Sequence, residues 1–355
     1  GITYKIKLSL MSQVITYTLD IRKDIDRLCS ENYDQMFILT DDTTEQLCRP
    51  LLGHINGVGK SIVIPAGDDN KTLETVSKVW TELQQRKASR HSLLINLGGG
   101  MVTDLGGFAA STFKRGIDFV NIPTTLLAMV DAAVGGKTGI NFNDFKNEIG
   151  VFRDAREVII DTSFLRSLDS QNLRSGYAEM LKHSLLKDTA MWASHVTFDL
   201  CKPNFVQLQE MVRQSIEVKR AVVAEDPTEK GIRKALNLGH TFGHALESLA
   251  MLQQRTGLHG YFVAWGLICE LYLSCSQGFP IDKMRQTVRY IRENYGNFPF
   301  SCNDYEHLYQ LMLHDKKNVG DVINFTLLRD VGDILIDQHA TKEEVFEAFD
   351  FLREG

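Results

Sequence analysis

Short runs of β-branched and other apolar residues recur through the first half of the chain, separated by polar or amphipathic stretches. These runs predict strands at residues 36–40, 61–65, 92–97, 119–123 and 157–161, with a helix over residues 71–87. Strands that alternate with helices favour a mostly parallel sheet covered on both faces. The pattern therefore predicts an α/β domain over residues 1–161.

The pattern changes after residue 161, where strand-like runs nearly vanish. Long helical stretches replace them at residues 173–186, 205–225 and 261–276. Only residues 322–328 and 332–336 regain strand-like character, and together they predict a hairpin. We expect a second, mainly α-helical domain over residues 162–355, with no internal repeat.

Charge and composition narrow the function classes. The chain has 355 residues, and its 39 Lys and Arg against 45 Asp and Glu give a net charge of −6. This balance argues against sequence-independent nucleic-acid binding, which needs excess cations to neutralise phosphates. The longest apolar stretches, residues 124–134 and 264–269, fall short of the roughly 20 residues that a membrane helix needs. We therefore expect neither a nucleic-acid partner nor a membrane span.

The cysteines and the amino terminus point to the cytoplasm. None of the six cysteines forms a C-x-x-C pair, which favours scattered reduced thiols over a disulfide framework or a thiolate metal site. The first residues contain two lysines and no long apolar centre, so they do not predict a signal peptide. The chain begins with Gly1, and one interpretation places the native start at Met11.

A glycine-rich turn follows the predicted strand at residues 92–97. Gly98, Gly99 and Gly100 precede a helical stretch, and such a turn lets backbone N–H groups approach a phosphate at a helix N-terminus. The strict dinucleotide fingerprint fails because Thr103 stands at its last glycine, so an ordinary tight turn remains an alternative. Asp41 ends an earlier strand, where it would accept ribose hydroxyls or cap a helix.

A second glycine pair lies before Lys137 and Thr138. The segment lacks the G-x-x-x-x-G-K spacing of a Walker A loop, so we do not assign it as one. A lysine beside permissive backbone is nevertheless a candidate contact for a phosphate or an oxyanion.

Histidines and a carboxylate form a candidate metal site in the second half. His240 and His244 are four residues apart, which places them on one helix face, but Thr241 stands where a zincin has its glutamate. Catalytic zinc usually takes three His or carboxylate ligands and keeps one position open. Glu179, His240, His244 and His259 offer such a set. Helical histidine pairs are also common on protein surfaces, and spacing alone leaves that alternative open.

Several of these segments recur together in one known family. They are residues 98–108, 114–116, 122–127, 130–139, 146–147, 176–179, 236–244, 259–260 and 315–317. In this combination and order, the chain resembles the 3-dehydroquinate synthase family of sugar-phosphate cyclases from about residue 41 to residue 317. The resemblance implies a Rossmann-like NAD-binding domain followed by a helical metal- and substrate-binding domain.

The resemblance also implies a role for individual residues. Glu179, His240 and His259 match the family's zinc ligands, which also accept cobalt, and His244 matches a histidine beside the substrate. The positions that match substrate or catalytic contacts are Asp131, Lys137, Asn147, Lys182, Lys219, Arg233, Asn237 and one of Lys316 and Lys317. The positions that match NAD contacts are Asp41, Asp68, Lys71, Gly99, Gly100, Met101, Asp104, Thr124, Thr125, Asp131, Lys137 and Lys146. Arg115 matches an arginine that reaches the neighbouring subunit's site in a homodimer.

The family reaction converts 3-deoxy-D-arabino-heptulosonate 7-phosphate to 3-dehydroquinate and phosphate, in the shikimate pathway of aromatic amino acid biosynthesis. It proceeds by transient oxidation by NAD, phosphate elimination, re-reduction, ring opening and intramolecular aldol closure. The cations listed above match a substrate that carries both phosphate and carboxylate. This sequence departs from the family pattern at Asp68, Thr103, Tyr261 and Phe262.

Three alternatives remain at this point. A sister cyclase such as 2-deoxy-scyllo-inosose synthase would act on a substrate without a carboxylate. A metal-dependent polyol dehydrogenase would accumulate NADH, whereas a cyclase would not. An inactive NAD-binding module would fold correctly but release no phosphate.

Overall fold

The computed structural model describes residues 13–315, 318 and 320–354. Met11, Lys316 and Lys317, each named above, lie outside the described residues. The chain divides into two compact units, residues 1–167 and 168–355, which we describe separately.

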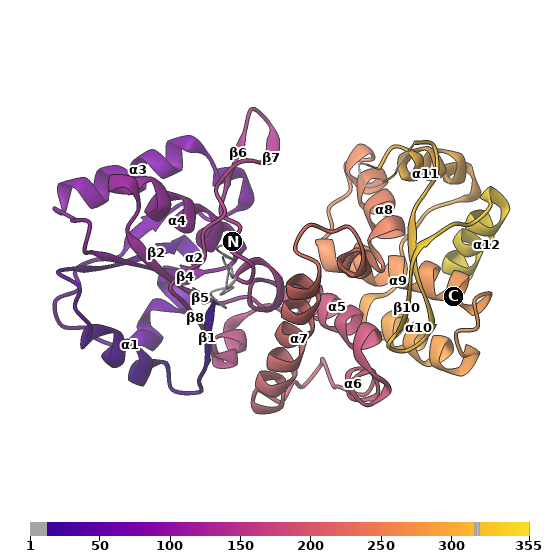
Figure 1. The fold of residues 1–355 in the computed structure, drawn as a ribbon, viewed down its shortest axis with the longest axis horizontal. Coiled ribbons are helices and arrows are strands. Elements are labelled where there is room, and N and C mark those ends of the chain that lie inside the picture. Colours follow the sequence, from indigo (N-terminus) through magenta and orange to yellow (C-terminus); the bar gives the residue numbers. More distant parts are fainter. Residues whose placement is uncertain (1–12, 316–317, 319, 355) are drawn as a thin grey trace, which may run out of the picture. The chain divides into compact units, whose positions relative to one another are not determined.

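A six-stranded parallel sheet forms the centre of the first unit, with strand order β1-β8-β5-β4-β2-β3 (Figure 1). Its strands are β1 (Val14–Tyr17), β2 (Met36–Asp41), β3 (Ile62–Ile64), β4 (Leu93–Gly98), β5 (Asp118–Pro123) and β8 (Glu157–Ile160). The five strands predicted from the sequence are all present, which confirms the α/β fold. The pattern did not predict β1, a short strand at the edge of the sheet, where only one neighbour pairs with it.

Helices pack on both faces of this sheet. The helices of the first unit are α1 (Ile21–Cys29), α2 (Asp42–Leu47), α3 (Leu73–Gln85) and α4 (Gly100–Thr112). Apolar side chains of α1 share one buried core with alternate residues of the central strands, such as Ile38 and Ile95. On the opposite face α4 lies very close to the sheet, because a Cβ on Gly106 would come 1.9 Å from Asn96 Oδ1.

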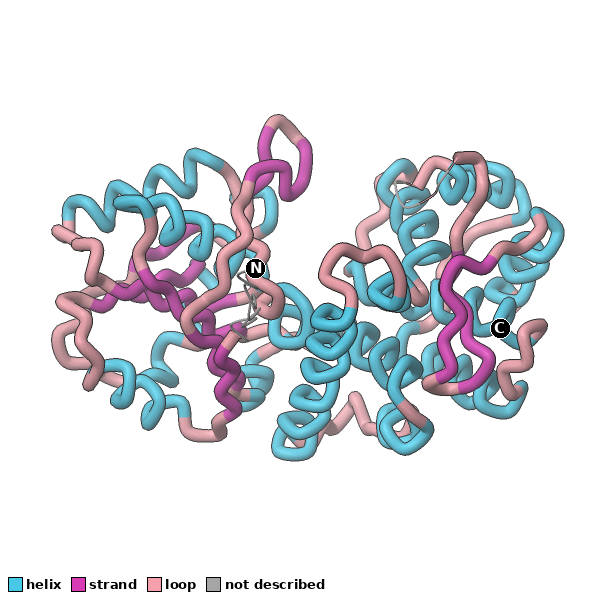
Figure 2. Tube along the Cα trace, in the orientation of Figure 1, coloured by secondary structure: helices cyan, strands magenta, loops and turns pink. Residues whose placement is uncertain are grey.

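Shorter elements complete the first unit. They are the 3₁₀ helices η1 (Arg49–Leu52), η2 (Asp68–Asn70), η3 (Phe113–Arg115) and η5 (Thr162–Ser167), the π-helix η4 (Ala128–Ala132), and the hairpin strands β6 (Ile140–Phe142) and β7 (Phe145–Ile149). The antiparallel β6–β7 hairpin was not predicted, and it extends from the unit in Figure 2. Its residues include charged positions and a left-handed turn, so they lack a clear strand pattern.

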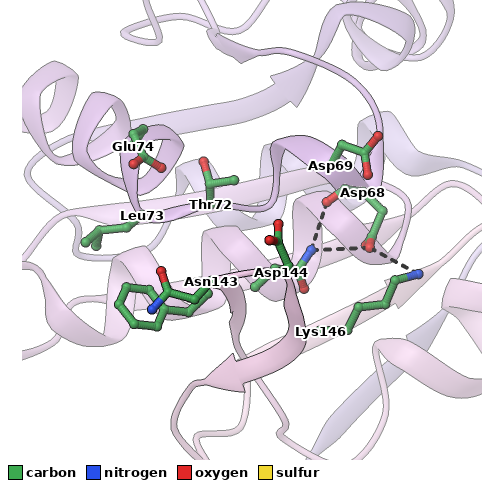
Figure 3. A pocket seen from close by; sticks show the side chains of 10 residues that line it. Asp68, Asp69, Thr72, Leu73, Glu74, Asn143, Asp144 and Lys146 are labelled. Atoms are coloured by element: carbon green, nitrogen blue, oxygen red, sulfur yellow. Dashed lines mark hydrogen bonds and ion pairs between the residues drawn. The ribbon is translucent and has the colours of Figure 1, made fainter.

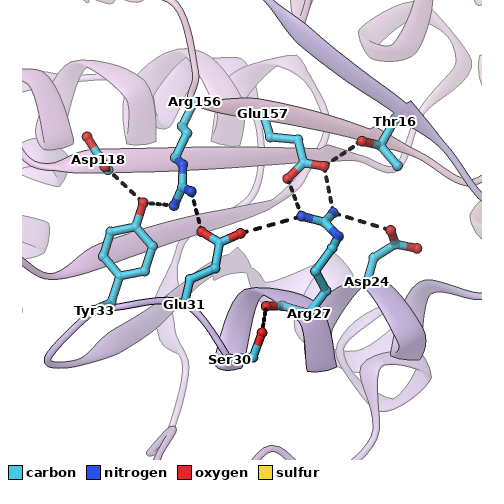
Figure 4. A network of polar contacts seen from close by, with 9 residues as sticks. All are labelled: Thr16, Asp24, Arg27, Ser30, Glu31, Tyr33, Asp118, Arg156 and Glu157. Atoms are coloured by element: carbon cyan, nitrogen blue, oxygen red, sulfur yellow. Dashed lines mark hydrogen bonds and ion pairs between the residues drawn. The ribbon is translucent and has the colours of Figure 1, made fainter.

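A polar network joins α1 to the sheet edge that carries β1 (Figure 4). Arg27 of α1 donates to Glu157 of β8 at 2.6 Å, and Thr16 of β1 donates to the same carboxylate. Arg156 pairs with Glu31 and lies over the ring of Tyr33, whose hydroxyl donates to Asp118 at 2.9 Å. Polar and charged side chains thus help to anchor β1, an edge strand that buries little apolar surface.

The second unit is mainly helical, as predicted. Its helices are α5 (Ser170–Lys187), α6 (Thr189–His195), α7 (Phe205–Glu225), α8 (His240–Leu252), α9 (His259–Cys275), α10 (Ile281–Tyr295), α11 (Tyr305–Leu313) and α12 (Lys342–Arg353), with 3₁₀ helices η6 (Ile232–Asn237) and η7 (Cys302–Asp304). Strands β9 (Phe325–Asp330) and β10 (Asp333–Gln338) form the predicted hairpin. Among the described residues, no helix combines the length and apolar character needed to cross a membrane.

Helix α9 is the buried centre of the second unit, and α8 crosses it at very short range. A Cβ on Gly266 of α9 would lie 1.9 Å from the carbonyl oxygen of Gly239 and 2.7 Å from the amide nitrogen of Gly243. Glycine at these positions therefore lets the two backbones meet. This close approach determines how far apart the side chains at the beginnings of α8 and α9 lie.

Candidate metal and cofactor sites

Three side chains from three helices of the second unit converge on one point. Glu179 of α5 places Oε1 at 3.1 Å from His240 Nε2 and 3.4 Å from His259 Nε2. One ligand atom from each of the three residues lies within 4.8 Å of the others. This geometry and donor set, two imidazoles and one carboxylate, fit a catalytic divalent metal such as zinc.

The helix beginnings bring these ligands together. His240 and His259 are the first residues of α8 and α9, and Glu179 lies inside α5. The amide of Gly260 donates to Ser175 Oγ at 3.0 Å, one turn before Glu179. A Cβ at Gly260 would lie 1.9 Å from the Ser175 carbonyl oxygen, so glycine is needed where α9 meets α5.

Glu179 is ionised in this setting although it is 2 % exposed. Burial opposes its charge, but the neighbouring Lys182 and His240 outweigh burial and hold the pKa of the Glu179 carboxyl well below its usual range. Lys182 Nζ lies 2.6 Å from Glu179 Oε2 and donates to the Leu236 carbonyl at 2.8 Å. Glu179 therefore offers ionised carboxylate oxygens to a cation.

The far nitrogens of both histidines also have acceptors. His240 Nδ1 lies 3.1 Å from the Leu238 carbonyl oxygen, and His259 Nδ1 lies 3.5 Å from Glu247 Oε2. Burial lowers the pKa of His240, which favours the neutral ring that a metal needs. Burial also opposes protonation of His259, but the contacts with Glu179 and Glu247 outweigh it and raise its pKa to about 10.

His244 lies beside this cluster and outside the group of three. Its ring centroid is 5.3 Å from that of His240, and its Nδ1 is 3.8 Å from Asp315 Oδ2. Of the four ligand candidates that spacing alone offered, Glu179, His240 and His259 meet. His183, close to Glu179 in the sequence, is buried and contacts Ser215 Oγ at 2.6 Å, so it belongs to the core.

Other predicted substrate residues of the second unit lie on α7 and η6. Asn237 ends η6 three residues before His240, and Arg233 lies in the same short helix. The Arg233 guanidinium donates to the Pro227 carbonyl at 2.8 Å. Lys219 is half-buried on α7. Lys316 and Lys317 are not among the described residues, so the structure places neither.

In the first unit the glycine turn has the predicted form. Strand β4 ends at Gly98, Gly99 is the N-cap of α4, and the Thr124 amide donates to the Gly98 carbonyl at 2.9 Å. A Cβ on Gly99 would lie 3.1 Å from Thr125 Cγ2. Gly100 and Met101 begin α4, with its amide groups at the end of the parallel sheet. This is the place at which α/β proteins bind dinucleotide phosphates.

A buried lysine organises a second cluster in the first unit. Lys71 is 4 % exposed, and its Nζ lies 2.6 Å from Asn147 Oδ1, 3.3 Å from Asp104 Oδ2 and 3.5 Å from Asp68 Oδ1. Burial raises the pKa of the Asp104 carboxyl to about 6, although Lys71 opposes the shift. Four residues that sequence predicted as cofactor or substrate contacts thus form one cluster.

A cavity adjoins this cluster between η2, the start of α3 and the β6–β7 hairpin (Figure 3). Asp68 and Lys146 line it and lie 3.8 Å apart. Asn141 Nδ2 donates to the Asp68 carbonyl at 3.0 Å, which ties the hairpin to η2. The predicted NAD contacts Asp68 and Lys146 therefore face the same space.

The remaining predicted residues occupy turns. Asp41 is the N-cap of α2, since its Oδ1 accepts from the Thr44 amide at 2.8 Å, so the capping alternative is confirmed. Asp131 is half-buried in η4, and Lys137 is exposed after Gly135 and Gly136, whose φ values are 107° and 71°. Arg115 is exposed in a turn where its φ is 68°.

Three departures from the family pattern have local structural accounts. Thr103 is buried, and its hydroxyl donates to the Gly100 carbonyl at 3.2 Å, so it continues α4 without disturbing the turn. Phe262 is 3 % exposed and packs edge-on against Trp265. Tyr261 packs edge-on against Tyr295. Phe262 therefore belongs to the core directly after the first turn residues of α9, and Tyr261 is partly buried beside it.

Sequence reasoning missed Glu247 as a member of the site. It stands seven residues after His240 and three after His244, so helical periodicity places it on the same face of α8. That spacing was the available signal, but only the structure shows that His259 from α9 lies against it.

Comparison with solved structures first defines the class of fold. The chain matches 2-deoxy-scyllo-inosose synthase, solved with carbaglucose-6-phosphate, NAD+ and Co2+, at a TM-score of 0.79 and 23% identity, covering 96% of each chain. It matches 2-epi-5-epi-valiolone synthase from Streptomyces hygroscopicus, solved with NAD+ and Zn2+, at 0.79 and 24% identity, covering 97% of each chain. The fold is therefore that of the sugar-phosphate cyclases.

Sequence comparison then identifies the family. The 3-dehydroquinate synthase N-terminal domain matches residues 61–175, and the C-terminal domain of the same family matches residues 176–318. The 3-dehydroquinate synthase of Parabacteroides distasonis is 52% identical over 350 residues, covering 98% of this chain and 99% of the relative. That of Corynebacterium diphtheriae is 39% identical over 293 residues, covering 82% and 81%. The chain belongs to the 3-dehydroquinate synthase family.

Proposed function

We propose that this chain is a 3-dehydroquinate synthase, an NAD- and metal-dependent lyase that converts 3-deoxy-D-arabino-heptulosonate 7-phosphate to 3-dehydroquinate and phosphate. The observation that carries the proposal is the convergence of Glu179, His240 and His259 beside Lys182, in a chain of this family. The 52% identical relative, matched over nearly its whole length, supports the same activity.

The ligand cluster would hold zinc, or cobalt in its place. The solved cyclases that share this fold carry Co2+ in one case and Zn2+ in the other. Bound there, the ion would supply a Lewis acid that lowers the pKa of a substrate hydroxyl. The protein would contribute an ionised Glu179, a neutral His240 and a partly exposed His259 as ligands.

NAD would bind in the first unit at the glycine turn and the Lys71 cluster. When bound it would supply transient hydride uptake and return, without net turnover. Gly99 and Gly100 offer amide groups to its phosphates at the start of α4, and Asp41 ends the neighbouring strand β2. The remaining cofactor positions are Asp68, Lys71, Met101, Asp104, Thr124, Thr125, Asp131, Lys137 and Lys146.

Cationic and amide side chains would bind the anionic substrate. Lys182, Lys219 and Arg233 would neutralise its phosphate and carboxylate, and arginine grips a carboxylate by two parallel hydrogen bonds. The other proposed contacts are Asp131, Lys137, Asn147, Asn237, Lys316 and Lys317. His244, whose side chain is 36% exposed and lies next to Asp315, would contact the substrate beside the metal ligands.

A homodimer, in which Arg115 reaches the neighbouring copy's site, is part of the same proposal. Arg115 is exposed, and the Arg153 guanidinium lies against Gly116 directly after it. Phe152 beside Arg153 is 84% exposed, and Phe145 on β7 is 67% exposed. Large exposed aromatic side chains such as these support association with a second copy. We place the reaction in the cytoplasm, in keeping with free cysteines throughout the described residues.

The decisive assay supplies the heptulosonate phosphate with zinc and a catalytic amount of NAD. We expect release of phosphate without accumulation of NADH, and loss of activity with a chelator or with His240→Ala. The same assay with glucose 6-phosphate distinguishes the alternative activity of a 2-deoxy-scyllo-inosose synthase, because that enzyme should act on glucose 6-phosphate. Absence of phosphate release from the folded, metal- and NAD-loaded protein would refute the proposal.

Mixing two inactive variants tests the dimer. Arg115→Ala and Glu179→Gln should each abolish activity alone. After subunit exchange, about a quarter of wild-type activity should return, since half of randomly formed dimers are mixed and each holds one intact site. No recovery despite proven exchange would mean that Arg115 acts within its own chain or not at all.

A further inference from the structure

Glu247 contacts the His259 ring at the nitrogen opposite the one that faces the metal-ligand cluster. Its Oε2 lies 3.5 Å from His259 Nδ1, while His259 Nε2 lies 3.4 Å from Glu179 Oε1. Glu247 belongs to α8, the helix that begins with His240, whereas His259 begins α9. Glu247 of α8 therefore contacts His259, the proposed metal ligand on α9.

The chemistry of this contact sets the tautomer of the ring. An ionised carboxylate only accepts hydrogen bonds, so Nδ1 of His259 must carry the hydrogen that it donates to Glu247. In the neutral ring, Nε2 then presents its lone pair to the ligand cluster. We propose that Glu247 is a positioning residue for the metal site, which orients His259 and makes its Nε2 a stronger donor. The inference rests on the proposed function, because it concerns the same metal.

The two histidines differ in how strongly packing restrains their rings. His240 has a side chain that is 12% exposed and lies against the Leu238 carbonyl of its own segment. The His259 side chain is 33% exposed, so less packing restrains its ring. A charged acceptor compensates for that freedom, as outer carboxylates commonly do for metal-bound histidines. Glu247 therefore restrains the less buried of the two rings.

The close crossing of α8 and α9 keeps this contact in place. Gly243, one turn before Glu247, would place a Cβ 2.8 Å from the Phe262 carbonyl oxygen. The backbone on which Glu247 stands is thus packed directly against the first turn of α9. This packing keeps the Glu247 carboxylate close to the His259 ring.

Zinc binding to the metal-free protein tests the inference without any need for turnover. We expect Glu247→Ala to raise the zinc Kd by about 10- to 100-fold, measured by competition with a chelating indicator. Glu247→Gln should recover part of the affinity, because its amide oxygen still accepts from Nδ1. The visible absorption of the cobalt-loaded protein should change with Ala and return towards wild type with Gln.

Controls separate positioning from general stability and from failure of the site itself. Glu210→Ala removes an exposed carboxylate that pairs with Arg213 on α7, and it should leave the zinc Kd unchanged. The inference is refuted if Glu247→Ala binds zinc within twofold of wild type, or if both Glu247 variants destabilise the metal-free fold as much as they weaken binding. His240→Ala in the same titration distinguishes failure of the proposed metal site from failure of the role proposed for Glu247. If His240→Ala also leaves zinc binding intact, the metal site itself is wrong.

Discussion

One carboxylate in each unit lies beside a buried lysine, yet the pKa values of the two carboxylates shift in opposite directions. Asp104 in the first unit has a pKa raised to about 6, and Glu179 in the second has a pKa well below its usual range. Glu179 is the more deeply buried of the two, with its side chain 2% exposed against 22% for Asp104. Burial alone would therefore predict the reverse order.

The neighbours explain the difference. Glu179 has Lys182 at 2.6 Å and two histidine nitrogens at 3.1 and 3.4 Å. Asp104 has Lys71 at 3.3 Å, but that ammonium is closer to Asn147 and is shared with Asp68. A lysine already surrounded by acceptors stabilises a carboxylate less than one directed at it. In the first cluster two carboxylates share one ammonium, whereas in the second Glu179 has one ammonium directed at it and two imidazole nitrogens beside it.

Glu179→Gln should produce the largest effect. It leaves Lys182 buried without its carboxylate, and breaking a buried pair costs about 3–5 kcal/mol of unfolding free energy. Urea unfolding in the presence of a chelator measures this cost without contributions from bound metal. Metal analysis of the purified variant should find no stoichiometric zinc. Retention of zinc at wild-type level would remove Glu179 from the ligand set and with it the contrast between the two clusters.

Asp104→Asn should change how stability depends on pH. Because the folded pKa of Asp104 lies above the unfolded value, the folded state holds a proton that the unfolded state releases between about pH 4 and 6. Stability from this group is therefore present at low pH and lost as pH rises through about 6, by about 2 kcal/mol after allowance for partial exposure. Glu179 has the opposite sign, and its contribution is lost only as pH falls below its unfolded value.

The measurement is the difference in unfolding free energy between Asp104→Asn and wild type, in NAD-free protein from pH 4 to 7. The difference should shift in favour of the variant as pH rises. A difference that stays constant over this range would mean that Lys71 offsets burial fully, and the pKa values of the two carboxylates would then not shift in opposite directions.

Lys71→Met should have the smallest effect of the three substitutions, and the quantity it should change is the affinity for NAD. Loss of a charged hydrogen-bonding group costs about tenfold in NAD affinity, while Asp104 takes up a proton in place of its partner. Fluorescence titration with NAD gives the Kd. Lys182→Met is the matched control, because it removes a buried lysine from the other cluster and should leave the NAD Kd unchanged. Equal losses in both variants would contradict separate roles for the two clusters.

Much of the fold was accessible from periodicity. Helix α7 begins and ends at the residues expected for it, and all five predicted strands are present. The strand β1 and the β6–β7 hairpin were missed, because edge strands and exposed hairpins lack the continuous apolar runs of buried parallel strands. β1 pairs with β8 and also contacts, through Thr16, the pair of Arg27 and Glu157, which lie 130 positions apart.

The family resemblance named Glu179, His240 and His259 as one ligand set, whereas residue spacing alone did not. Spacing identified His240 and His244 as a pair on one helix face, yet the structure brings His240 together with Glu179 and His259 from two other helices. No local pattern predicts that contact. It requires α8 and α9 to cross at Gly243 and Gly266, and α9 to meet α5 at Gly260.

The sequence by itself determined the order of strands and helices, the glycine turn before α4 and the kinds of side chain available for chemistry, because these follow from local periodicity and from motifs of adjacent residues. Only the tertiary structure decided which carboxylate stays ionised and which residue supports His259. Those properties depend on distances between side chains far apart in the chain, and electrostatic interactions in a buried setting change steeply with such distances.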